Sequence, residues 1–155
     1  MRRFPSSPRR RGRALTWCVR GAFAAVLAVN VACALQFAFA PASSMGAYGL
    51  SGTAGEAACR GMGVAFLMWN CTYPLVIWKP QRHTTLAGVV LAQQVVGLIG
   101  ESAIRATLPA GHDLLASSID LFIVFDAAGL LLMGISLAVF LFIRNLCSKR
   151  REIDS

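Results

Sequence analysis

The chain has 155 residues, of which 56% are hydrophobic and only 14% are charged, and its mean hydropathy is +0.61. This composition excludes an ordinary soluble domain and predicts one all-α membrane domain that uses nearly the whole chain. The formal net charge of +8 comes mostly from basic residues that flank apolar segments, a distribution that favours the lipid bilayer and its anionic headgroups as partners and argues against nucleic acid.

Residues 1–13 are basic and contain Pro and Ser without hydrophobic periodicity, which predicts a disordered cytoplasmic tail. Residues 14–40 are apolar and end at Pro41, so they are long enough for a first transmembrane helix. The alternative is a secretory signal peptide, because the apolar run ends in an A-x-A motif at residues 38–40. We favour a retained helix, because the run is longer than the usual apolar region of a signal peptide and Pro41 would directly follow the cleavage site.

The second span is predicted over residues 57–78. Before it, Thr53 and Glu56 stand at the spacing of a capping box, in which each side chain bonds a free backbone N–H at a helix start. We therefore interpret Glu56 as a helix cap. Pro74 predicts a kink near the end of the span, and Asn70 within it predicts a hydrogen bond to another helix.

The third and fourth spans are predicted over residues 85–108 and 118–143. The connection at residues 79–83 is so short that the second and third spans must form an antiparallel hairpin. Ser117 and Asp120 resemble a helix start, where the helix dipole stabilises a carboxylate.

Basic residues predict the orientation of the spans. Seven lie up to Arg20, two lie in the 79–83 connection and four lie in the polar segment 144–155, against only Arg60 and Arg105 near the other side. The positive-inside rule then predicts a four-helix bundle over residues 14–143, with both termini and the basic tail 144–155 in the cytoplasm.

Polar and charged residues within the spans form the main candidate site. Isolated ionised side chains in hydrocarbon cost on the order of 3 kcal/mol, so such residues are expected to face the bundle interior and find partners. In the third span, Gln94, Gly97, Glu101 and Arg105 share one helical face. The predicted topology places the charged members in the outer half of the bundle and the amides deeper; the full candidate cluster is Arg60, Asn70, Gln94, Glu101, Arg105, Asp120 and Asp126.

Two interpretations of this cluster stay open. In the structural one, which we favour, Arg60 or Arg105 neutralises Glu101 and Asp126 and fixes the helix register, and Glu101 also pairs with Arg105 at i, i+4. In the functional one, Glu101 or Asp126 is a proton or cation site in a polar cavity that is open to the outside and that Gln94 and Asn70 extend inward.

The residues give no signature of an enzyme. The sequence lacks a nucleophile elbow, an HExxH motif, a phosphate-binding glycine loop and a CxxC pair. His112 and Asp113 alone are too few ligands to indicate a metal site. We therefore expect no catalytic residue, no cofactor and no metal.

The pattern of spans resembles the DoxX-like bacterial membrane proteins and related small domains of unknown function. The resemblance covers residues 14–143 and rests on a first helix that ends at Pro41, a second that opens with the motif Arg-Gly-Met-Gly at residues 60–63 and closes near Pro80, and polar residues at similar depths in the last two helices. Glu101 departs from the pattern, because some relatives carry Arg there. The resemblance implies an inner-membrane four-helix bundle that is in some cases an accessory of respiratory or redox complexes, and it transfers no catalytic residue.

Together these features predict a non-catalytic membrane component or accessory subunit, whose partner is a second copy of the chain or another membrane protein. The alternative is a small ion- or proton-coupled transporter that uses its intramembrane carboxylates. That alternative requires a homo-oligomer, because four helices of this size are too few to enclose a wide pathway.

Overall fold

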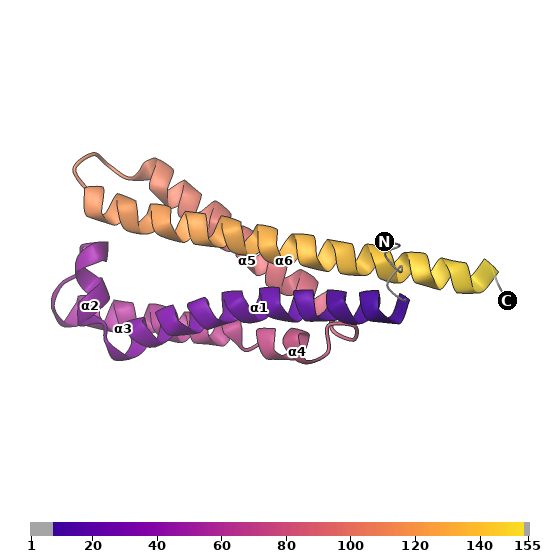
Figure 1. Cartoon of the computed structure of the whole chain (residues 1–155). Coiled ribbons are helices and arrows are strands. Elements are labelled where there is room, and N and C mark those ends of the chain that lie inside the picture. Colours follow the sequence, from indigo (N-terminus) through magenta and orange to yellow (C-terminus); the bar gives the residue numbers. More distant parts are fainter. Residues whose placement is uncertain (1–7, 154–155) are drawn as a thin grey trace, which may run out of the picture.

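The computed structural model describes residues 8–153, and this part of the chain is all-α, without a strand. Figure 1 shows the elements in space. In chain order they are α1 (Pro8–Phe39), α2 (Ala42–Met45), the 3-10 helix η1 (Gly46–Tyr48), α3 (Gly52–Asn70), α4 (Tyr73–Trp78), α5 (Thr84–Thr107) and α6 (Asp113–Ile153).

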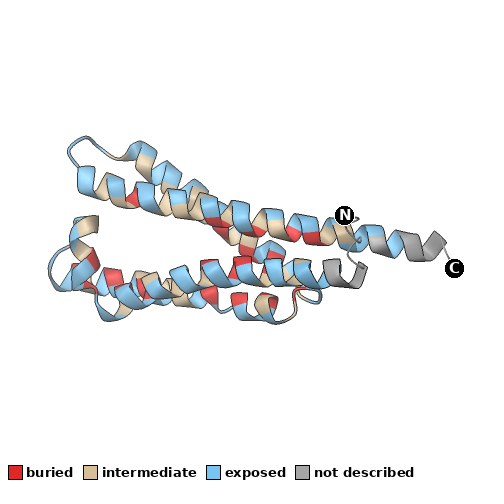
Figure 2. Ribbon diagram, viewed as in Figure 1, coloured by how far each residue is buried: buried red, intermediate tan, exposed pale blue. Residues whose placement is uncertain are grey.

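Four helical segments are long and apolar enough to cross a membrane: Gly12–Phe39, Gly52–Trp78, Thr84–Thr107 and Asp113–Leu146. Their outward faces are also apolar, as shown by the exposed Val96 and Ile99 of α5 and Ile135 of α6, and Figure 2 shows buried residues mainly where the helices face one another. The chain exposes 10484 Å², whereas a compact soluble protein of 16.6 kDa exposes about 7600 Å². A large apolar surface is therefore left for a non-aqueous environment.

Helix α1 is the centre of the arrangement, because it packs against α3, α4 and α6. Helices α5 and α6 pack against each other as an antiparallel pair. The start of α1, the turn between α4 and α5 and the C-terminal end of α6 lie at one end of the molecule, and α2, η1 and the α5–α6 connection lie at the other (Figure 1).

Two apolar clusters fill the interior. Near the end where α1 starts, Val19 and Phe23 of α1 pack with Val76 of α4, Val90 of α5 and Met133 of α6, and all five are fully buried or nearly so. At the opposite end an aromatic cluster joins four elements, with ring centroids 5.7 to 6.3 Å apart; its members are Phe37, Tyr48, Phe66 and Phe122.

The predicted break in the second span is confirmed. Helix α3 ends at Asn70, and α4 begins at Tyr73 with Pro74 in its first turn. Proline is tolerated at this position because the first turn of a helix has no internal partner for its backbone N–H.

Three predicted boundaries are wrong. Helix α1 begins at Pro8, so residues 8–13 of the expected disordered tail are helical, while residues 1–7 lie outside the described part of the chain. Helix α6 begins at Asp113, one turn before the predicted start at Ser117. It also continues to Ile153 through the segment expected to be a tail, because that segment contains no proline or glycine that would end a helix.

The close packing of α3 on α1 depends on Gly63. A Cβ atom built at Gly63 would lie 2.6 Å from the backbone N of Ala38 and 2.7 Å from the backbone O of Ala34. These are backbone atoms that cannot move aside, so only glycine allows this approach of the two helices. At Gly61 the same added atom would meet nothing within 4 Å.

We predict that Gly63→Ala lowers the free energy of unfolding by about 1–3 kcal/mol, because the new methyl group forces α1 and α3 apart. Gly61→Ala is the matched control and should leave stability unchanged or raise it by up to about 1 kcal/mol through helix propensity. The measurement is unfolding of the detergent-solubilised protein in increasing dodecyl sulfate, followed by circular dichroism. Equal stability of the two variants would contradict the packing described above.

Candidate functional site

Asp126 is the central residue of the candidate site. It lies on α6 within an apolar sequence, and its Oδ1 accepts a hydrogen bond of 2.6 Å from Nε2 of Gln94 on α5. The hydroxyl of Tyr73, at the start of α4, donates to Oε1 of the same Gln94 at 3.4 Å. Gln94 is buried, so its amide connects three helices in the interior, with one donor and its acceptor both in use.

Two glycines make room for this pair of side chains. A Cβ at Gly97 would lie 2.7 Å from Oδ2 of Asp126, and a Cβ at Gly129 would lie 3.4 Å from Nε2 of Gln94. Gly97 is on α5 and Gly129 is on α6, so each helix provides the space that the polar side chain of the other occupies. The expected shared face of Gln94 and Gly97 therefore has a direct use: it is the face that receives Asp126.

Asn70 makes the interhelical contact predicted for it. Nδ2 of Asn30 on α1 donates to Oδ1 of Asn70 on α3 at 3.3 Å, and Nδ2 of Asn70 donates to the backbone O of Phe66 at 2.7 Å. The prediction is confirmed, and the pair adds a polar contact to the α1–α3 interface.

The two arginines of the cluster do not neutralise Glu101 and Asp126, so the pairing predicted in the structural interpretation is wrong. Arg60 pairs with Glu56 one turn before it on α3, with an N–O distance of 2.6 Å. Arg105 pairs with Asp120 across the α5–α6 interface at 2.8 Å. These are the two ion pairs among the side chains that the structure describes, those of residues 12–146, 148 and 149, and the i, i+4 pair of Glu101 with Arg105 is not formed.

The pairing with Arg60 also corrects the interpretation of Glu56. Helix α3 begins at Gly52 after Ser51, which makes no side-chain cap bond. Glu56 therefore lies inside the first turns of the helix, where an arginine four residues later is within reach, and the capping box with Thr53 is not formed.

Glu101 lies at the end of the cluster nearest the aromatic residues. Its Oε2 is buried and has no hydrogen-bond partner. Nearby in η1, outside the apolar spans, burial is the main effect that raises the pKa of the Tyr48 phenol, with smaller contributions from Cys33 and Glu101. Tyr48 is therefore a neutral hydroxyl group over the whole physiological pH range.

The seven predicted residues thus separate into distinct contacts. Asn70 joins α1 to α3, Gln94 joins α4, α5 and α6, and Arg105 with Asp120 joins α5 to α6. Arg60 is satisfied within its own helix. Tyr73 was not among the predicted residues. Its position one turn after Asn70 could have indicated that it lies on the same inward side of the second span.

Among the described residues, no group of three or more His, Cys, Asp or Glu side chains is arranged to hold a metal ion. Cys18, Cys33, Cys59 and Cys71 are free thiols. Two of these sulfur atoms contact backbone oxygens: Sγ of Cys71 lies 3.3 Å from the O of Leu67, and Sγ of the buried Cys59 lies 3.9 Å from the O of Pro41.

Comparison with known proteins finds no matching family model, no similar curated protein and no similar solved structure. The resemblance to the DoxX-like proteins therefore stays a prediction.

We predict that Gln94→Leu lowers the free energy of unfolding by about 1–3 kcal/mol, because it leaves Asp126 and the Tyr73 hydroxyl buried without their partner. Its neighbour Gln93 provides the control, since Oε1 of Gln93 is buried without a hydrogen bond. Gln93→Leu removes that unsatisfied group at similar volume and should be neutral or stabilising. Unfolding in dodecyl sulfate measures the stability of both variants. If Gln94→Leu were as stable as Gln93→Leu, the Gln94 amide would not hold the helices together.

Proposed function

We propose that the chain is a four-span integral protein of a bacterial inner membrane, with both termini in the cytoplasm. The four long apolar helices and their exposed apolar faces support insertion. The start of α1 and the C-terminal end of α6 lie at the same end of the molecule, as an even number of membrane crossings requires (Figure 1). The basic residues at that end, among them Arg20, Lys79 and Arg144, support the cytoplasmic assignment.

Within that membrane we propose a non-catalytic role, as a component or accessory subunit that binds another membrane protein or a second copy of itself. The observation that carries this proposal is that several polar side chains are bonded to one another across helices: Asn30 with Asn70 and Tyr73 and Asp126 with Gln94 in the interior, and Arg105 with Asp120 at the surface. Polar groups used in this way hold a bundle together and leave the outward apolar faces free for lipid and a partner. An accessory role is also what the resemblance to DoxX-like proteins implies.

We predict that the chain stays in the membrane after an alkaline wash and that epitopes at both ends are protected from protease added outside spheroplasts. An epitope inserted after Gly111, in the exposed connection between α5 and α6, is the control that should be cut. Cleavage of either terminal epitope from outside would contradict the four-span topology. A mature protein that lacks the N-terminal epitope would show that the first helix is a cleaved signal peptide.

A second candidate function has its own observation in support. Neither Asp126 nor Glu101 has a basic partner among the described residues, and Oε2 of Glu101 is buried without a hydrogen bond. Unpaired carboxyl groups within apolar helices are typical of proton and ion pathways. The alternative is therefore a homo-oligomeric carrier that uses Asp126 to bind a proton or a cation.

The purified protein in liposomes distinguishes the two functions. For a non-catalytic component, we predict that a pH gradient decays at the rate of empty liposomes and that Asp126→Asn changes nothing, because the amide oxygen still accepts the hydrogen bond from Gln94. A carrier would instead accelerate the decay, and Asp126→Asn would abolish that acceleration. The same comparison with gradients of sodium and potassium extends the test to cations.

A further inference from the structure

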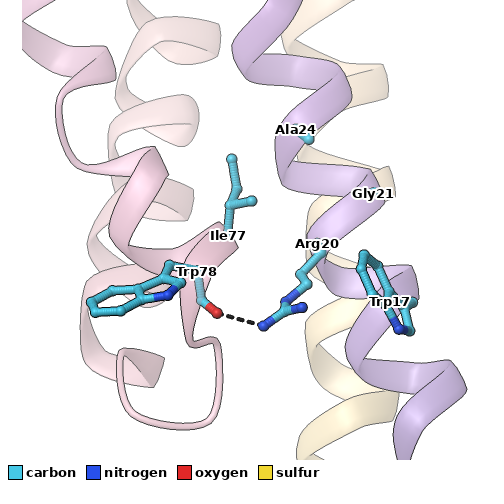
Figure 3. Close-up of a pocket in the computed structure, with 6 residues that line it drawn as sticks. All are labelled: Trp17, Arg20, Gly21, Ala24, Ile77 and Trp78. Atoms are coloured by element: carbon cyan, nitrogen blue, oxygen red, sulfur yellow. Dashed lines mark hydrogen bonds between the residues drawn. The ribbon is translucent and has the colours of Figure 1, made fainter.

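A pocket opens on the surface at the end of the molecule where α1 starts. It is about 320 Å³ in volume and lies between α1 and the end of α4, and Figure 3 shows the six residues that line it; they are Trp17, Arg20, Gly21, Ala24, Ile77 and Trp78. Its volume is within the range of sites that hold small ligands. It is distinct from the Asp126 cluster, which lies deeper along the same bundle.

Arg20 supplies the charge of this pocket. Its Nη2 reaches across from α1 and donates to the backbone O of Trp78 at 2.5 Å (Figure 3). Its Nε is buried and has no hydrogen-bond partner, and Arg20 takes part in neither of the ion pairs found among the described side chains. The bond to Trp78 thus orients a guanidinium group whose charge has no acidic partner among the described side chains, which is an arrangement suited to an anionic oxygen.

A second cation and two indole rings border the same site. The guanidinium carbon of Arg20 lies 5.0 Å from the ring centroid of Trp17, and the ammonium group of Lys79 lies 4.0 Å from that of Trp78. Both rings are more than half exposed. Tryptophan is enriched at the boundary between headgroups and hydrocarbon, where an apolar ring with a polar N–H is favourable.

The remaining wall of the pocket is small and apolar. Gly21 and Ala24 follow Arg20 along one side of α1, and Ile77 faces them from α4. A Cβ at Gly21 would meet nothing within 4 Å, so the space beside the helix is open at this point. This wall runs from the charged end toward the apolar middle of the helices, as needed for a ligand with a charged head and a hydrocarbon tail.

We propose that this pocket binds an anionic phospholipid of the cytoplasmic leaflet. Its phosphate accepts hydrogen bonds from Arg20 and is attracted by Lys79, and the first part of an acyl chain lies over Gly21, Ala24 and Ile77. The proposal rests on the membrane insertion proposed above. It goes further, because it assigns the lipid to one defined site. A general attraction of anionic lipids to the basic residues at this end of the molecule would not require such a site.

Tryptophan fluorescence tests the proposal, because two of the three tryptophans border the pocket and Trp69 lies on α3. In a Trp69→Phe protein reconstituted in phosphatidylcholine vesicles, a small fraction of phosphatidylglycerol with brominated chains should quench the emission more than the same fraction of brominated phosphatidylcholine. Arg20→Gln should lower this preference for the anionic lipid about fivefold, since one basic contact is lost. Arg82→Gln, which removes the same charge from the exposed turn at the same end, should keep it.

Gly21→Leu is the second variant, because Arg20→Gln also loses the bond to Trp78 and could fail to fold. The leucine fills the apolar wall while keeping the cation, so it should reduce the preference in a folded protein. Equal quenching by the two lipids, or a preference that survives both variants, would overturn the lipid site while insertion stands. Competition by inorganic phosphate at constant ionic strength would overturn the choice of a lipid as the ligand. If neither brominated lipid quenches, insertion itself is refuted.

Discussion

Placing polar groups in an apolar interior costs free energy unless they are hydrogen-bonded, and this cost constrains the structure. The hydrogen bond between Gln94 and Asp126 is the main contact that offsets it. Asp126 has no cation beside it among the described residues, so its carboxyl group depends on the amide of Gln94 at 2.6 Å. Gly97 leaves the space for this carboxyl group, because a Cβ there would lie 2.7 Å from Oδ2 of Asp126. The bond and this close contact fix the register of α5 against α6.

Much of the fold follows from the sequence. Apolar length alone predicts the four helices, since lengths near 20 residues are set by the thickness of hydrocarbon, and Pro74 predicts the break between α3 and α4. The helix boundaries were harder to predict, because a start such as Asp113 has no strong capping signal and Ser117 has a better one. Polar helical extensions, such as the C-terminal part of α6, are also not visible in hydropathy.

Several of the polar contacts could be expected from the sequence, but most of the pairing could not. The orientation of the helices correctly suggested that Arg105, Asp120 and Asp126 lie toward one end, but it does not give depth. In an antiparallel pair, depth is set by distance from the connecting turn. Gln94 and Asp126 are equally far along the chain from the α5–α6 connection, whereas Arg105 lies closer to it than Asp120 does. Counting from the turn would therefore have matched Gln94 with Asp126, but it would not have found the pair of Arg105 and Asp120.

The two ends of the bundle are built on different chemistry. At one end, aromatic rings from α1, η1, α3 and α6 close the interior. At the other, arginine side chains donate to backbone carbonyl groups: Arg20 to Trp78 and Arg144 to Gln81. Both carbonyls belong to the end of α4 or the turn that follows it, so α1 and α6 are both tied to this short connection.

Helix α6 has a mechanical consequence that follows from its length. It runs without a break for 41 residues and contains no proline, the commonest cause of a sharp kink. It is therefore a stiff rod of about 60 Å, roughly twice the thickness of a hydrocarbon layer. A tilt of about 10° at Asp126 would displace the far end of this rod by roughly 7 Å. The helix thus acts as a lever that carries small movements of the bundle to a distant C-terminal end.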